Sequence, residues 1–309
     1  HFFSRELLVS FEPILLAPEE EPVEVYPYRR VWETTWLEIT VMFLVAALIY
    51  AGTYVFDFVP GDARDTGSRV VLALLPLGAW LVFSYRSERR AVEPRQHILS
   101  VLILGALVAG AIAQPLTERL FVPERWLPEQ GFFGRVLGYT FTLGFTAVFL
   151  KYAVLRYTVW INYFRQRLDA AAYALAVSLG FASVLNIQFA LDTNATIAST
   201  GLWVASNTFA HLGTGVVVGF FLGELRSGRP PVIWMPAGLL LAAFLSGIHY
   251  GFRGIAIVSS LGVGATASRP IGGLLLSFGF VAVMLIVFAF LIRSADERQE
   301  AMIGRRELL

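Results

Sequence analysis

The chain of 309 residues is 56% hydrophobic and only 15% charged, with a mean hydropathy of +0.65 and a formal net charge of +1. This composition excludes an ordinary soluble domain and indicates an integral membrane protein. The near-neutral charge predicts no nucleic-acid partner. The absence of cysteine excludes disulfides, thiolate chemistry and cysteine-ligated metals.

The first 36 residues hold no long apolar run and are predicted to form an extended cytoplasmic tail. Prolines at positions 13, 18, 22 and 27 prevent a regular helix, and three consecutive glutamates favour a solvated stretch. We expect this tail to pack either on the protein's own cytoplasmic face or along a partner subunit.

Eight apolar segments then reach the roughly 17 to 25 residues that a transmembrane helix needs. They are continuous runs without the alternation of barrel strands, which favours helices. We therefore predict an all-α, multi-pass protein of the cell's inner (cytoplasmic) membrane. The segments cover residues 37–56, 69–85, 97–114, 135–160, 170–191, 202–224, 233–252 and 271–292.

The distribution of lysine and arginine predicts the orientation of these segments. With the N-terminal tail placed in the cytoplasm, the connections on that side hold 15 of the 24 basic residues and the outer connections hold five. Because cytoplasmic connections are enriched in basic residues, both termini are expected in the cytoplasm. No connection is long enough to form a soluble domain, so the function must lie in the membrane or in the tails.

Lys151 is the only lysine of the chain, and it lies about midway along the apolar segment 135–160. A lysine ammonium there costs at least a few kcal/mol unless it finds a partner or a wet cavity. We expect its amine to meet backbone carbonyls, water, Tyr173 or an acidic group of a partner.

Polar and small residues follow one face of the next segment at intervals of three or four positions. Such a stripe is typical of close helix packing, because small residues let two backbones approach and polar ones bond across the interface. Its members are Asp169, Tyr173, Ala176, Gly180, Ser183 and Asn186. The following segment continues this style with Gly215, Gly219 and Gly223, which also predict tight packing.

The sixth and seventh segments, 202–224 and 233–252, each carry a histidine. His211 shares a helix face with Asn207, and His249 lies in the seventh segment. A single membrane histidine is typical of hydrogen-bonded packing, and two of them near an asparagine and a lysine add a shared cavity as an alternative. At about 1.5 Å per residue, both histidines, Asn186 and Asn207 are expected in the outer half of the bilayer, and Lys151 deeper.

The order of these residues resembles the PrsW-type intramembrane proteases, which belong with the CAAX-processing enzymes to the glutamate-dependent membrane proteases. In that family a Glu-Glu-x-x-Lys motif opens one helix, an Asp and a Tyr precede Gly-Phe-Ala-x-x-Glu-Asn on the next, and single histidines mark the two that follow. The resemblance covers about residues 135–253. The matching residues are Lys151, Asp169, Tyr173, Gly180, Phe181, Ala182, Asn186, His211 and His249.

Three glutamates that the resemblance implies are absent from this chain. Ala147 and Val148 stand at the positions of the paired glutamates, and Leu185 stands at the glutamate of the second motif. The family's chemistry, as implied by the resemblance, needs a carboxylate to take a proton from water, which these apolar residues cannot do. Two histidines without a carboxylate at membrane depth also fall short of the three protein ligands of a catalytic zinc, so no metal or other cofactor is predicted.

On this basis we divide the chain into five parts: the tail (1–36), three N-terminal helices with an outer loop (37–134), a PrsW-like core (135–254), an outer loop with the last helix (255–292) and a C-terminal cytoplasmic tail (293–309).

The sequence favours a catalytically inactive relative, a pseudoprotease that serves as a scaffold or binding subunit in a larger membrane complex. The expected partners are the lipid bilayer and other membrane subunits or single-span helices. The predicted binding groove comprises Tyr173, Asp169, Ser183, Asn186, Asn207, His211 and His249.

Two alternatives stay open at this point. One is an active membrane protease with a divergent site built from His211, His249, Asn186 and Lys151. The other is a transporter or lipid-binding protein whose buried Lys151 receives an anionic group.

Overall fold

The computed structural model describes residues 28–58, 60, 63–91, 94–160, 163–164, 166–227, 230–257 and 270–307. Most of the expected N-terminal tail, positions 1–27, lies outside these residues, and so does the outer loop between 258 and 269. Within the described residues, every regular element is a helix.

Eight helical stretches of the described chain are long and apolar enough to cross a membrane, and each coincides with one of the predicted segments. The prediction of an all-α, multi-pass membrane protein is therefore confirmed. The spans are Val31–Tyr54, Thr66–Arg89, Ile98–Phe121, Phe132–Thr158, Arg167–Leu191, Ile197–Arg226, Trp234–Phe252 and Gly272–Arg298.

Five of the spans lie in uninterrupted α-helices, whereas the other three are broken by π-helical turns. The uninterrupted helices are α3 (Tyr28–Tyr54), α10 (Arg167–Leu191), α11 (Ile197–Ser227), α12 (Trp234–Ile257) and α13 (Pro270–Glu307). The interrupted spans are α4 (Thr66–Trp80) with η1 (Leu81–Tyr85) and α5 (Arg86–Arg89), α6 (Ile98–Val108) with η2 (Ala109–Ala113) and η3 (Leu116–Phe121), and α8 (Phe132–Tyr139) with η4 (Thr140–Gly144) and α9 (Phe145–Thr158).

The first helix begins earlier than the sequence predicted. Residues 28–36 were assigned to an extended tail, but they form the start of α3. The physical reason is the position of the last helix-breaking residue: Pro27 immediately precedes the helix, and no proline follows until Pro60. At the other end of the chain, α13 continues beyond its membrane span through most of the expected C-terminal tail.

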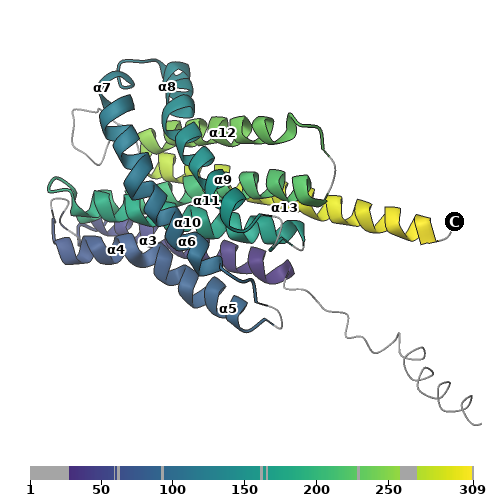
Figure 1. The fold of residues 1–309 in the computed structure, drawn as a ribbon. Helices are drawn as coiled ribbons and strands as arrows, with labels where there is room; N and C mark the ends of the chain where they lie inside the picture. The colour runs from purple at the N-terminus through teal and green to yellow at the C-terminus, as the bar shows by residue number, and fades with distance from the viewer. Residues whose placement is uncertain are drawn as a thin grey trace, which may run out of the picture.

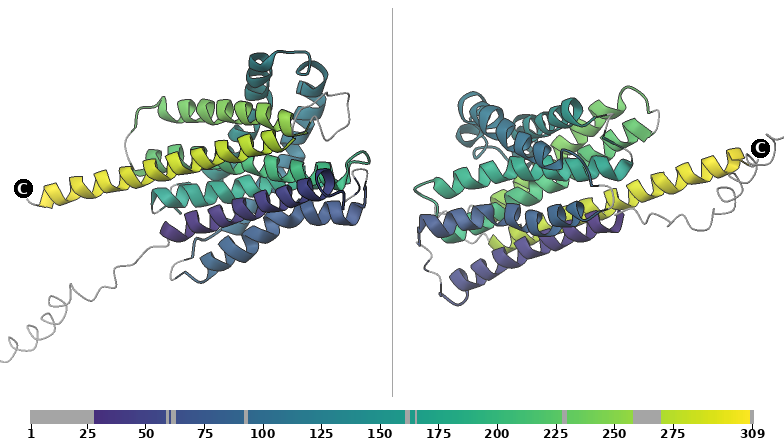
Figure 2. Two further views of the ribbon diagram at one scale, coloured as in Figure 1. Left: turned by 180° about the vertical axis from the view of Figure 1, so that it is seen from behind. Right: turned by 60° about the horizontal axis from the view of Figure 1, so that its bottom comes forward.

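The helices run mostly side by side, with α10 and α11 in the middle of the bundle (Figures 1 and 2). The start of α3 and the end of α13 lie at the same end of the bundle, as an even number of spans requires (Figure 1). The spans containing α6 and α8–α9 cross the others steeply and meet at the short helix α7 (Pro123–Trp126). We call these two spans the crossing hairpin.

Glycines allow the central helices to approach closely. A Cβ on Gly219 of α11 would lie 2.7 Å from Cα of Ala171 in α10, and one on Gly223 would lie 3.0 Å from the carbonyl oxygen of Arg167. On the far side of α10, a Cβ on Gly180 would overlap the backbone of Leu102 in α6. The predicted role of these small residues in tight helix packing is therefore confirmed.

Candidate functional site

A pocket of about 360 Å³ lies between the crossing hairpin and helices α10, α11 and α12. Its wall is rich in aromatic rings, and two of them, Phe189 and Trp203, are stacked with centroids 4.2 Å apart. Tyr139 of α8 and Tyr250 of α12 also line it, with their rings in contact at 5.4 Å. The pocket lies toward the end of the bundle opposite the chain ends, because Pro123 of α7 lines it.

Two of the positions at which the resemblance implies glutamate face this pocket. Ala147 of α9 and Leu185 of α10 both line it, whereas Val148 is fully buried in the main hydrophobic core. The helices thus bring two separate motif positions to one cavity, as a catalytic arrangement would require. The side chains there are apolar, so they supply no group that could exchange a proton with water.

The pocket carries polar groups that sequence reasoning missed. Gln188 Nε2 donates a hydrogen bond to Gln114 Oε1, and Gln114 Nε2 donates to Glu118 Oε1 at 2.7 Å. Asp192 also lines the pocket, and its Oδ1 accepts the backbone N–H of Asn194 at 2.8 Å. The available signal was the presence of Gln114 and Gln188 near the ends of otherwise apolar segments, where polar side chains are rare.

Lys151 lies one helical turn from Ala147, which lines the pocket, and its side chain is fully buried. Its amine donates to the carbonyl oxygen of His211 and to Thr214 Oγ1, both at 3.2 Å, and it lies 5.6 Å from the centroid of the Phe181 ring. The expectation that it meets backbone carbonyls is confirmed. Tyr173 is not its partner, since the hydroxyl of Tyr173 donates to the carbonyl oxygen of Gln96.

Asn186 and Asn207 join α10 to α11. Asn207 Nδ2 donates to Asn186 Oδ1 at 2.9 Å, and Asn186 Nδ2 donates to Thr208 Oγ1 at 3.1 Å. Of the seven residues in the predicted groove, Asn207 alone lines the pocket; Asn186 is buried behind it.

The two histidines lie in different surroundings. The His211 ring packs against Phe181 of α10 at 4.9 Å between centroids. His249 Nε2 lies 2.8 Å from the carbonyl oxygen of Ser206, and its ring contacts Phe280 of α13 at 6.2 Å. Neither histidine lines the pocket, so the arrangement gives no support to a divergent catalytic site that uses both.

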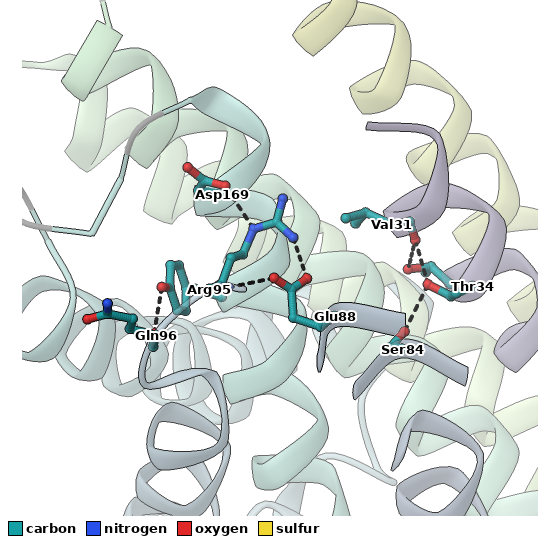
Figure 3. A network of polar contacts seen from close by, with 9 residues as sticks. Val31, Thr34, Ser84, Glu88, Arg95, Gln96 and Asp169 are labelled. Atoms are coloured by element: carbon teal, nitrogen blue, oxygen red, sulfur yellow. Dashed lines mark hydrogen bonds and ion pairs between the residues drawn. The ribbon is translucent and has the colours of Figure 1, made fainter. Parts of the chain in front are cut away.

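The remaining groove residues, Asp169, Tyr173 and Ser183, do not line this pocket either. Asp169 Oδ1 accepts a hydrogen bond from Arg95 Nε at 2.8 Å at the other end of the bundle, and Figure 3 shows Arg95 between Asp169 and Glu88. Ser183 Oγ donates to the carbonyl oxygen of Leu179 in its own helix. The stripe runs the length of α10: Asp169 at its start bonds to Arg95, whereas Asn186 near its end bonds to α11, so its two ends do not share one cavity.

The described residues hold no group of three or more His, Asp or Glu side chains placed to bind a metal ion. The two acidic side chains that line the pocket are Glu118 of η3 and Asp192, which directly follows α10. The two histidines do not line the pocket. The residues present therefore do not fit a catalytic zinc, which takes three protein ligands around one open position.

Comparison with known proteins agrees with the resemblance seen in the sequence. The family described as "PrsW family intramembrane metalloprotease" matches residues 93–292. The chain is 25% identical over 186 residues to Protease PrsW of Halalkalibacterium halodurans, covering 59% of this chain and 81% of that protein. It is 26% identical over 175 residues to Protease PrsW of Bacillus subtilis, covering 55% and 76%. No solved structure matches the chain. Because the family match extends over more than half of its length, the chain belongs to the PrsW family of intramembrane proteases.

Proposed function

We propose that this protein is a catalytically inactive member of its family in the cell's inner (cytoplasmic) membrane. In this proposal it binds a transmembrane helix of a partner protein in the pocket between the crossing hairpin and helices α10, α11 and α12. The observation that carries the proposal is the placement of Ala147 and Leu185 on the pocket wall. Both stand where the family resemblance implies a glutamate, and neither can activate water.

The polar residues near this wall do not replace the missing acids. Lys151 donates to a carbonyl and a hydroxyl, and Asn186 and Asn207 bond to each other. The name of the family implies a metal ion, but the described residues do not provide a ligand set for one. The proposal therefore includes no catalytic step and no metal.

The pocket has the properties of a site that receives side chains. Its volume of about 360 Å³ falls within the range of ligand pockets, and its aromatic wall offers apolar contact area. Gln114, Gln188 and Glu118 can exchange hydrogen bonds with polar groups at the end of a bound helix. In a bilayer, close packing and such hydrogen bonds are the forces that hold helices together.

The proposal can be tested with a photoreactive residue placed in the pocket. We expect a benzophenone side chain at Leu143, which lines the pocket, to form a discrete adduct with one membrane protein in cells. Leu185→Trp, which fills the pocket with an indole, should reduce that adduct at least tenfold without loss of folded protein.

A lipid-facing position provides the matched control. Leu240 of α12 is 51% exposed, so the same probe there should yield lipid adducts, and Leu240→Trp should leave the pocket adduct unchanged. The partner identified by mass spectrometry should also cross-link after purification and co-reconstitution in vesicles. Lipid adducts alone at both positions would contradict the proposed binding role.

A further inference from the structure

A second polar region lies near the start of α10 and the end of the α4–η1–α5 span, and Figure 3 shows its side chains. Its centre is Arg95, whose Nη1 lies 2.6 Å from Glu88 Oε2 and whose Nε lies 2.8 Å from Asp169 Oδ1. The backbone N–H of Arg95 donates to the other oxygen of Glu88 at 2.6 Å. All three side chains are buried, and both oxygens of Glu88 are bonded.

Glu38 of α3 lies next to this cluster inside a membrane span and is only 4% exposed. Its Oε1 accepts a hydrogen bond from Ser84 Oγ at 2.5 Å, and Ser84 Oγ lies 2.9 Å from Thr34 Oγ1. Among the described residues, no basic side chain forms an ion pair with Glu38, and its second oxygen accepts no hydrogen bond.

Glu38 borders a small cavity of about 40 Å³ between α3 and the α4–η1–α5 span. A cavity of roughly 10–15 Å³ can hold one water molecule. This cavity of about 40 Å³ therefore has room for a small ion together with a water molecule. The polar groups around it belong to Thr34, Thr35, Glu38, Ser84, Ser87 and Glu88. All of them present oxygen atoms, which are the donors that hard cations prefer.

Arg95 forms ion pairs with Glu88 and Asp169 and none with Glu38, and Asp169 is further stabilised at the N-terminus of α10, where its Oδ2 accepts the backbone N–H of Gln166 at 2.9 Å. Among the residues that the structure describes, Glu38 has no ion-pair partner although it is buried at membrane depth, where an isolated carboxylate is costly. One positive charge in the cavity would remove that cost.

We propose that this cavity binds one sodium ion, held by the free carboxylate oxygen of Glu38 and the hydroxyls of Ser84 and Thr34. The bound ion ties α3 to η1 beside the cluster of Arg95, Glu88 and Asp169, and so fastens the first two spans to the core, to which Asp169 of α10 belongs. This site is independent of the proposed binding pocket, and neither proposal depends on the other.

The test is the thermal unfolding of the full-length protein in detergent at pH 7.5, in sodium chloride and in choline chloride of equal ionic strength. Because a ligand that binds only the folded state stabilises it by mass action, the Tm should rise with the logarithm of the sodium concentration. Equilibrium binding of radioactive sodium should give one ion per chain. Glu38→Gln should abolish both the binding and the sodium dependence of the Tm.

Glu33→Gln is the matched control, since Glu33 is an exposed carboxylate on the same helix. It should retain the sodium-dependent Tm and the binding of one ion. If Glu38→Gln does not fold, Ser84→Ala serves instead: it keeps the carboxylate, removes one ligand and should shift the sodium dependence to about tenfold higher concentration.

Three results would overturn the proposal. One is an equal Tm in sodium and choline chloride for the parent protein. Another is unchanged sodium binding in the folded Glu38→Gln or Ser84→Ala variant. The third is a Tm that rises with acidification and is indifferent to sodium, which would assign the cavity to a proton on Glu38.

Discussion

At the scale of single residues, the protein accommodates its buried charges in two ways. Among the described residues, the amine of Lys151 contacts a carbonyl oxygen, a hydroxyl and an aromatic ring and forms no ion pair with a carboxylate. Arg95 instead bonds to two buried carboxylates, Glu88 and Asp169 (Figure 3). The second arrangement depends most on Arg95, because its loss removes a buried ion-pair partner from both carboxylates.

Arg95→Met should therefore be strongly destabilising. We expect a loss of about 3–5 kcal/mol, the usual cost of breaking a buried ion pair, measured by thermal or SDS-induced unfolding in detergent. Arg293→Met is the matched control, because the Arg293–Glu297 pair is of similar length but 75% and 60% exposed; its loss should cost less than about 0.5 kcal/mol. Equal effects of the two variants would contradict this account of the buried cluster.

The sequence predicted part of the candidate site. It indicated that Lys151 needs a partner, with backbone carbonyls among those expected, and that Asn186 and Asn207 lie at a similar depth in the outer half of the bilayer. It did not indicate Tyr139, Glu118 or Tyr250, because each is one polar or aromatic residue at a helix end. Their meeting depends on how the helices tilt, which no single segment specifies.

At the scale of elements, the packing of α11 on α10 forms the centre of the molecule. The glycines of α11 place its backbone directly on that of α10, so a side chain there has no space to occupy. Lipid tails are as apolar as leucine, and helix association in a bilayer depends on such close fit more than on hydrophobicity.

Gly219→Leu should separate these two helices. Its Cβ would lie 2.7 Å from the backbone of Ala171, and overpacking of this kind typically costs about 1–3 kcal/mol. Gly279→Leu on α13 is the control, because a Cβ there meets no atom within 4 Å and leucine favours the helix over glycine. A lowered Tm for Gly219→Leu beside an unchanged or raised Tm for Gly279→Leu is the expected outcome; similar values would refute the packing argument.

Segment length and hydropathy were sufficient to predict eight spans, since each span satisfies the bilayer on its own. They could not predict the steep path of the crossing hairpin or the π-helical turns η2 and η4 within it. Those features follow from contacts between helices, such as the approach of Gly144 to the backbone of Ala243 in α12.

At the scale of the whole molecule, the chain belongs to the PrsW family and has eight candidate membrane spans among its described residues, while the side chains of the pocket differ from those that the motifs imply. The fold of a family does not by itself carry its activity, which depends on particular side chains at the site. Here the helices bring Ala147 and Leu185 to one pocket, and these two residues decide the proposed function.

The central claim is that the pocket binds a partner's transmembrane helix and that the protein does not cleave it. A proteolysis assay tests this claim most directly. The purified chain is reconstituted in vesicles with single-span membrane proteins, including the partner captured at Leu143, and Protease PrsW of Bacillus subtilis serves as the positive control. We predict no cleavage above the level of protein-free vesicles, either for the parent chain or for His211→Ala. Site-specific cleavage by the parent chain that is lost in His211→Ala or His249→Ala would contradict the account.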